Sequence, residues 1–144
     1  MEKTLATIAE ALQHAHTRLQ ADLRKLEDEA APTSPATLTQ LRSHLQLTRV
    51  HVADHFQFEE QDGYMDTLRK REPRLERTIA GLAEEHEEMM QSLDALIDSS
   101  RKPNCQPKAI RERVREWIEH VRTHERKENE LVQDAFDFDV GAAD

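Results

Sequence analysis

The chain has 144 residues and a formal net charge of −9, with 37% of its residues hydrophobic and 34% charged. This length suits one domain, and the negative charge argues against a nucleic-acid or anionic-membrane partner. Three glycines and five prolines are too few for the tight turns of a β-sandwich or barrel, and no apolar run approaches the ~20 residues that cross a membrane. One cysteine and no signal-peptide pattern lead us to expect a cytoplasmic protein.

Four segments carry apolar residues at helical spacing, with charged residues on their opposite faces. The apolar stripes cover residues 5–26, 38–56, 75–96 and 110–131. Ser34 is expected to cap the second helix with Pro35 in its first turn, and Pro73 suits the start of the third. The pattern predicts an all-α, antiparallel up-down-up-down four-helix bundle as a single domain over residues 1–136. We expect residues 137–144 to form a short acidic tail that frays.

Eight histidines are more than twice the roughly 2% expected of an ordinary chain, and four of them fall on the stripes, one per helix. Two glutamates, Glu59 and Glu128, each follow one of these histidines by four residues and so share its helix face. A buried carboxylate must be paired or must bind a metal. Four imidazoles and two carboxylates at one level of a bundle form a nitrogen–oxygen ligand set for two transition-metal ions. Imidazole suits iron, zinc or copper, and bridging carboxylates suit iron or manganese.

The sequence also repeats itself, because the motif His-Val-x-x-His-x-x-x-Glu occupies both residues 51–59 and residues 120–128. In each half, an upstream histidine lies 39 or 38 residues before the second histidine of the motif. This spacing favours His16 over His14, which lies 41 residues before it and off the stripe. Two similar helical hairpins, docked about a pseudo-twofold axis, would bring the two glutamates close to that axis.

Residues 55–65, HFQFEEQDGYM, resemble the hemerythrin signature His-Phe-x-x-Glu-Glu-x-x-x-x-Met. Residues 82–87 and 124–128 are similar to the third- and fourth-helix segments of the same family. The resemblance extends from about Leu5 to Leu131 and implies a hemerythrin-like (HHE cation-binding) domain. It further implies two iron ions joined by an oxo or hydroxo bridge, with manganese or a mixed pair as the alternative. Matched residue by residue, the implied ligands are His16, His55, Glu59, His86, His124 and Glu128.

This chain departs from the oxygen-carrying members of that family at two positions. Their fifth histidine is replaced by Met90, and their fourth-helix Asp, five residues after its histidine, by Glu128 at four residues. A missing imidazole leaves open coordination positions, which argues against simple reversible oxygen carriage. The resemblance therefore implies a protein that binds or senses O2, NO or peroxide, more a carrier or sensor than a dedicated enzyme. The alternatives are an iron-dependent peroxidase, an NO/O2 reductase, an iron-storage or iron-delivery protein, and a metal-free bundle.

For most of the remaining residues of interest, a structural role is the first expectation. His51 and His120 each lie one turn before an implied ligand. We expect them to be boundary residues, and the alternative is that they support the ligands from outside or relay protons. His14 and His44 have no assigned role. Tyr64 is expected to pack at a helix end, and core packing is expected of a further group: Phe56, Met65, Met89, Met90 and Trp117. The identity of the metal, the redox partner and the oligomeric state stay open.

Overall fold

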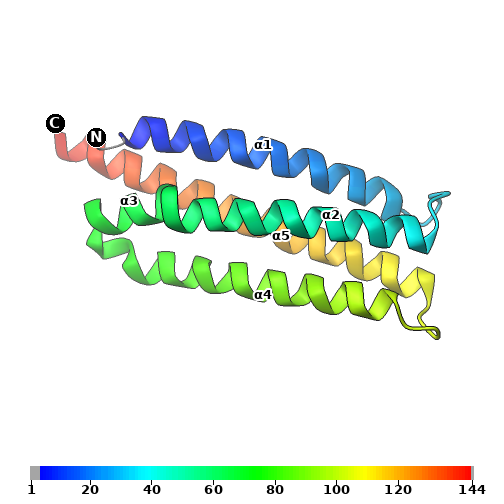
Figure 1. Cartoon of the computed structure of the whole chain (residues 1–144). Coiled ribbons are helices and arrows are strands. Elements are labelled where there is room, and N and C mark those ends of the chain that lie inside the picture. Colours follow the sequence, from blue (N-terminus) through cyan, green and yellow to red (C-terminus); the bar gives the residue numbers. More distant parts are fainter. Residues whose placement is uncertain (1–3, 144) are drawn as a thin grey trace.

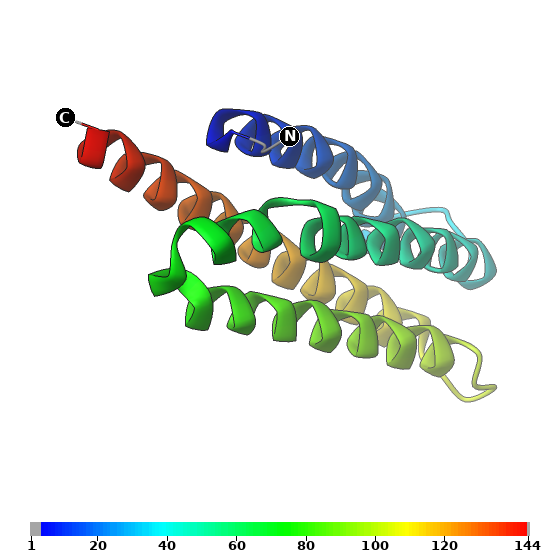
Figure 2. The ribbon, with the colours of Figure 1, turned by 60° about the vertical axis from the view of Figure 1, so that its left-hand side comes forward.

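A computed structural model describes residues 4–143, apart from the side chains of Asp62 and residues 138–143, and this part of the chain contains no strand. Its four long helices are α1 (Leu5–Ala30), α2 (Leu38–Gln57), α4 (Glu76–Ser100) and α5 (Pro107–Ala143). Helices α1 and α4 each pack against both α2 and α5, and α1 begins at the same end of the molecule at which α5 finishes (Figures 1 and 2). The predicted all-α, antiparallel four-helix bundle is confirmed.

The second helix begins at a different residue from the one expected. Thr37 caps α2, since its Oγ1 accepts from the Gln40 backbone N–H at 3.1 Å while Gln40 Oε1 accepts from the Thr37 N–H at 2.8 Å. This reciprocal pair satisfies two backbone donors at the helix start. Ser34 was the wrong choice, because its hydroxyl accepts from the Ala36 N–H at 3.1 Å within the loop. Pro35 therefore precedes the first turn.

Between α2 and α4 the chain forms three short elements that the sequence pattern does not predict. They are the π-helix η1 (Phe58–Asp62), helix α3 (Tyr64–Arg71) and the 3₁₀ turn η2 (Pro73–Leu75). Gly63 joins η1 to α3, and a Cβ there would lie 2.8 Å from the Phe58 carbonyl oxygen and 2.9 Å from Glu59 Cα. Only glycine allows this approach. The turn directs the buried side chains of Tyr64 and Met65 back into the bundle.

Helix α5 does not end near Phe136, because its backbone remains helical to Ala143. The frayed tail was therefore a wrong expectation for residues 137–143, and Asp144 lies outside the described residues. The domain limits stay a prediction. Within the described chain, no helix combines the length and apolarity that a membrane span requires.

The core consists of two apolar clusters along the bundle axis. One, at the end where α1 begins, includes Ile8, Leu12 and Leu131. The other includes Leu19 and Trp117 and continues toward the opposite end. His16 lies on α1 between Leu12 and Leu19, and so at the boundary between the clusters. The two clusters thus enclose a layer of buried polar side chains in the middle of the bundle.

Candidate metal centre

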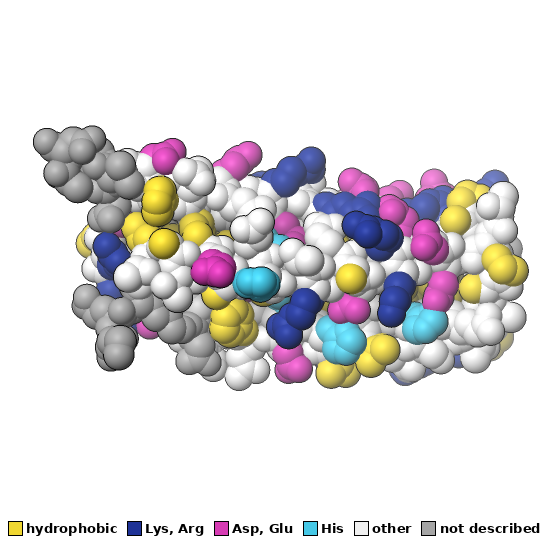
Figure 3. Space-filling view, turned by 90° about the horizontal axis from the view of Figure 1, so that it is seen from above, with side chains coloured by type: hydrophobic (Ala, Val, Ile, Leu, Met, Phe, Trp, Pro, Cys, Tyr) yellow, Lys and Arg dark blue, Asp and Glu magenta, His cyan; other side chains and the backbone are white. Residues whose placement is uncertain are grey.

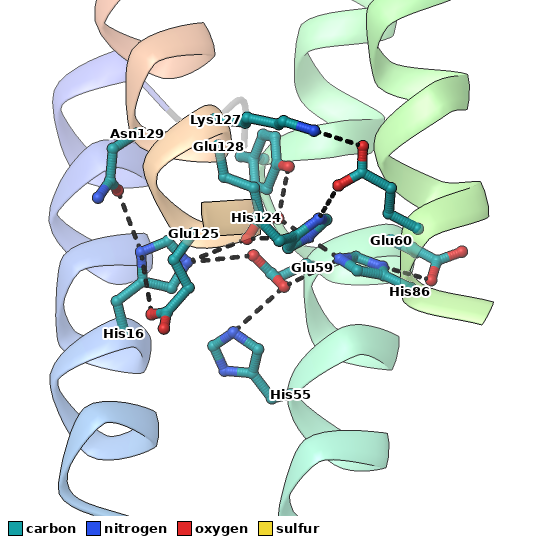
Figure 4. A network of polar contacts seen from close by, with 12 residues as sticks. His16, His55, Glu59, Glu60, His86, His124, Glu125, Lys127, Glu128 and Asn129 are labelled. Atoms are coloured by element: carbon teal, nitrogen blue, oxygen red, sulfur yellow. Dashed lines mark hydrogen bonds and ion pairs between the residues drawn. The ribbon is translucent and has the colours of Figure 1, made fainter. Parts of the chain in front are cut away.

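That polar layer brings together all six side chains implied by the resemblance (Figure 4). His16 Nε2 and His124 Nε2 lie 3.2 and 3.3 Å from Glu128 Oε1, and His55 Nε2 lies 3.2 Å from Glu59 Oε1. Both carboxylates have 0% exposure. Each long helix contributes at least one of the six side chains, because the histidine on each stripe occupies a core position at the same level of the bundle.

The fourth imidazole, that of His86, lies between the two carboxylates. Its Nε2 atom is 3.4 Å from Glu59 Oε1 and 3.5 Å from Glu128 Oε2. The ring of Phe56 stacks on the His86 ring, with centroids 4.0 Å apart and planes 8° from parallel. Phe56 therefore packs in the core as predicted, and it also limits the rotation of this imidazole.

Several of these inward-facing atoms have no hydrogen-bond partner among the described residues. They are the Nε2 atoms of His55, His86 and His124 and both carboxylate oxygens of Glu59. Buried polar atoms in native proteins nearly always have a partner, and a converging set of unpartnered nitrogen and oxygen donors fits bound metal.

These donors fall into two groups, within each of which the ligand atoms all lie within 4.8 Å of one another. The first group contains four residues: Glu59, His86, His124 and Glu128. The second contains three residues, His16, His55 and Glu59, so Glu59 belongs to both groups. A carboxylate has two oxygens, so the shared position of Glu59 suits a bridge between two ions.

Three of the four imidazoles also have an acceptor for their outer nitrogen. His86 Nδ1 donates to Glu60 Oε2 at 2.8 Å, and His124 Nδ1 donates to Glu85 Oε1 at 3.0 Å. His16 Nδ1 donates to Asn129 Oδ1 at 3.0 Å. Such partners fix the tautomer that leaves Nε2 free for a metal. His55 has no such partner in the part of the chain that the structure describes.

Tyr64 packs at the start of α3 as predicted, and its hydroxyl is also part of this layer. Its hydroxyl donates to Glu128 Oε2 at 2.6 Å, and the residue is only 1% exposed. Burial and the nearby charge of Glu128 raise the pKa of Tyr64, so the phenol stays a neutral donor.

A third carboxyl group lies beside the cluster. Glu125 is 3% exposed and accepts from Gln20 Nε2 at 2.9 Å, while its other oxygen is 3.7 Å from His16 Nδ1. Burial raises the pKa of Glu125 to about 7. The sequence held a signal for these outer residues, because Glu125 follows one histidine directly and Glu60 and Asn129 follow the two cluster glutamates.

Comparison with protein families agrees with this geometry. The hemerythrin HHE cation binding domain matches residues 7–136. The chain belongs to the hemerythrin HHE family. No curated protein and no solved structure matches it. The buried His/Glu cluster supplies the donors for a cation, so this hemerythrin domain is a metal-binding domain.

The other histidines of this hemerythrin domain lie at the surface. His51 donates from Nδ1 to Asp22 at 3.0 Å, His44 pairs with Glu29, and His14 and His120 are exposed. Both His51 and His120 are exposed, and the choice between a boundary role and outer support stays a prediction.

The predicted core side chains, by contrast, are enclosed. Trp117 is buried and donates to the Met89 carbonyl at 2.9 Å, and Met65 is buried as well. Met90, which replaces the fifth histidine of oxygen carriers, packs half-buried against the apolar cluster that contains Trp117.

Before a metal binds, protons balance the charge of the cluster. Burial lowers the pKa of His16 and His86, but the close carboxyl groups of Glu128 and Glu59 outweigh it and raise both pKa values to about 10. Burial likewise opposes ionisation of Glu128. Its hydrogen bonds, which include the one to the His16 imidazole, nevertheless hold the pKa of that carboxyl well below its usual range. Two imidazolium groups then face the carboxylate of Glu128.

Metal uptake should therefore release protons. At pH 8 we expect about two protons per chain to leave on saturation with a divalent metal, since His16 and His86 must lose theirs to coordinate. Titration in weakly buffered indicator solution measures this. For the metal-free protein, the stabilisation from both raised pKa values is full below about pH 6.5 and is lost as pH rises toward 10. Release that is absent at pH 8 would contradict the assignment.

The hydroxyl of Tyr64 should contribute measurably to stability. In the variant Tyr64→Phe, we expect the free energy of unfolding of the metal-free protein to fall by about 2 kcal/mol, because a hydrogen bond to a buried charged group is lost. Urea denaturation followed by circular dichroism measures it, and metal content should stay unchanged. An unfolding free energy equal to that of the wild type would contradict the role assigned to this hydrogen bond.

Proposed function

We propose that this hemerythrin domain holds two iron ions and binds or senses a small ligand, O2, NO or peroxide. The observation that carries the proposal is the shared position of Glu59 in two converging donor groups. His86, His124 and Glu128 would hold one ion, His16 and His55 the other, and Glu59 would bridge them. Imidazoles with a bridging carboxylate suit iron, with manganese or a mixed pair as the alternative.

The charge of the site supports an anionic or polarisable ligand. Two divalent ions bring four positive charges, and the two cluster carboxylates offset half of this. When bound, a ferrous pair supplies electrons to O2 or binds NO. The chain itself fixes the imidazole tautomers through Glu60, Glu85 and Asn129, and it holds Glu128 in place through Tyr64. The apolar clusters on both sides exclude water from this chemistry.

The two donor groups are unequal, which supports ligand binding on one side. The group on α1, α2 and η1 has three protein donors, whereas the other group has four. An ion with three protein ligands keeps positions open for an external molecule. We therefore assign the small ligand to the ion held by His16 and His55.

Ligand addition to the anaerobic ferrous protein tests this proposal. We expect an absorbance change that saturates at about one O2 or NO per pair of irons, as for a carrier or sensor. Sustained consumption of peroxide or NO with an added electron donor would favour the peroxidase or reductase alternative. Uptake of many more than two irons per chain would favour storage, and no spectral change would contradict the proposal.

A further inference from the structure

The unpartnered outer nitrogen of His55 coincides with a cavity. A groove of about 650 Å³ between α1 and α2 is lined by Ala15, Arg18, Asp22, His51, His55 and Phe58, among others. Figure 4 shows the second ring nitrogen of His55 pointing away from the carboxylates. Figure 3 shows that charged, histidine and hydrophobic side chains are mixed on the face formed by α1 and its neighbours. The volume is in the range of small-molecule sites.

The internal repeat supplies a built-in comparison for this groove. Adding 70 to a residue number in α1, or 69 in α2, gives the counterpart in α4 or α5. A smaller cavity of about 380 Å³ lies between α4 and α5, and every residue that lines it is the counterpart of a groove residue. The two cavities are thus pseudo-symmetric, one beside each His-x-x-x-Glu pair.

The two cavities differ at the position that faces the outer nitrogen of the histidine, which is His55 in the groove and His124 beside the smaller cavity. In the smaller one, Glu85 accepts from the outer nitrogen of His124 and is itself bound by Lys127 Nζ at 3.0 Å. The counterparts of Glu85 and Lys127 in the groove are Ala15 and Phe58. Neither side chain offers an acceptor, and their apolar surface lines the space instead.

At this position the acceptor is either water or a ligand. When a metal occupies Nε2 of an imidazole, the proton resides on Nδ1 and is almost always donated to a carboxylate, a backbone carbonyl or water. In the other half of the molecule the acceptor is a carboxylate. The groove carries Arg18 where the smaller cavity has Glu88, so the charge at that point is reversed in favour of an anion. Of the two acidic groups in the groove, Asp22 is bound by His51, and exposed Asp54 is screened by water.

We propose that this groove binds a small carboxylate with an apolar or aromatic body. The carboxylate accepts from His55 Nδ1 and pairs with Arg18, while the apolar body lies against Ala15 and Phe58. The inference rests on the proposed metal site, because metal on Nε2 fixes the proton on Nδ1. Occupancy of the groove then acts on the ion with three protein ligands through His55.

Zinc-loaded protein labelled with ¹⁵N-histidine gives a direct test, with benzoate as the probe and benzamide as its uncharged counterpart. We expect one benzoate per chain by calorimetry, a shift of one histidine Nδ1–H resonance, and benzamide binding at least about tenfold weaker. Ala15→Glu restores the internal acceptor and should abolish binding. Arg18→Gln should weaken binding about fivefold or more. The exposed Arg113→Gln, outside the groove, should leave it unchanged.

The repeat offers a reciprocal variant. Glu85→Ala combined with Lys127→Phe and Glu88→Arg gives the other half the groove's residues at these three positions, and the stoichiometry should rise from one benzoate to two. Equal binding of benzoate and benzamide, or no binding to protein that holds two zinc ions, would overturn the inference and leave the metal site standing. Failure to take up zinc at all would instead count against the metal site.

Discussion

Replacement of Glu59 by glutamine is expected to abolish binding of both metal ions. Glu59 is the one residue that belongs to both donor groups, and both of its oxygens are buried without a hydrogen-bond partner. Glutamine keeps the side-chain volume but removes the negative charge and one of the two oxygens that a bridge requires. Loss of a residue that only hydrogen-bonds to a metal ligand lowers metal affinity about 10–100-fold. Because Glu59 would itself be a ligand, we expect its loss to lower metal affinity at least about 100-fold.

Metal content after dialysis against a weak chelator measures this effect, with about two ions per chain in the wild type and fewer than about 0.5 in Glu59→Gln. Glu84→Gln is the matched control, because Glu84 is an exposed glutamate with no contact to the cluster. Its metal content should equal that of the wild type. His16→Ala should lose one ion and keep the other. A Glu59→Gln protein that retains two ions would contradict the bridging role.

Metal removal is expected to produce the largest change in stability. Six buried polar side chains, four of them imidazoles, are held together in the centre of the bundle. Without an ion, several of their atoms lack partners, which is costly in a buried site. At a free metal concentration 1,000 times the dissociation constant, one site adds about 4 kcal/mol. For a chain of this size, that corresponds to a rise in Tm of roughly 10 °C.

Thermal unfolding with and without ferrous ion under anaerobic conditions measures this shift. The double variant His55→Leu and Glu59→Leu should lose it, because it lacks the donors, while its metal-free form should be at least as stable as the metal-free wild type. Identical melting curves for the wild type with and without metal would support the alternative of a metal-free bundle.

The fold was predictable because each long helix carries one narrow apolar stripe, and four stripes with short connections have one simple arrangement. The segment from Phe58 to Leu75 was not predictable on the same grounds. It has no long period, and its path depends on the close backbone approach at Gly63. The caps were missed for a similar reason, since Thr37 and Ser34 are both suitable residues and only the reciprocal bond to Gln40 decides between them.

The cluster was predictable to the extent that it follows helical spacing. Its histidines lie on the stripes, each cluster glutamate follows one of them by four residues, and the repeat of the His-x-x-x-Glu pair indicated a common level. The outer partners lie beside the stripes, where Glu85 resembles ordinary surface charge and only the position of Glu60 directly after a cluster glutamate gives a signal. Tyr64 contacts Glu128 across 64 residues of sequence, and this contact exists only because α3 turns back into the bundle.

Iron content and the optical spectrum of one sample test whether the cluster holds two iron ions. The protein is purified anaerobically, loaded with ferrous ion, desalted and exposed to air. We expect about two irons per chain and a near-ultraviolet oxo-to-iron absorption band that appears with air. Fewer than about 1.5 irons per chain, with no such band, would contradict it.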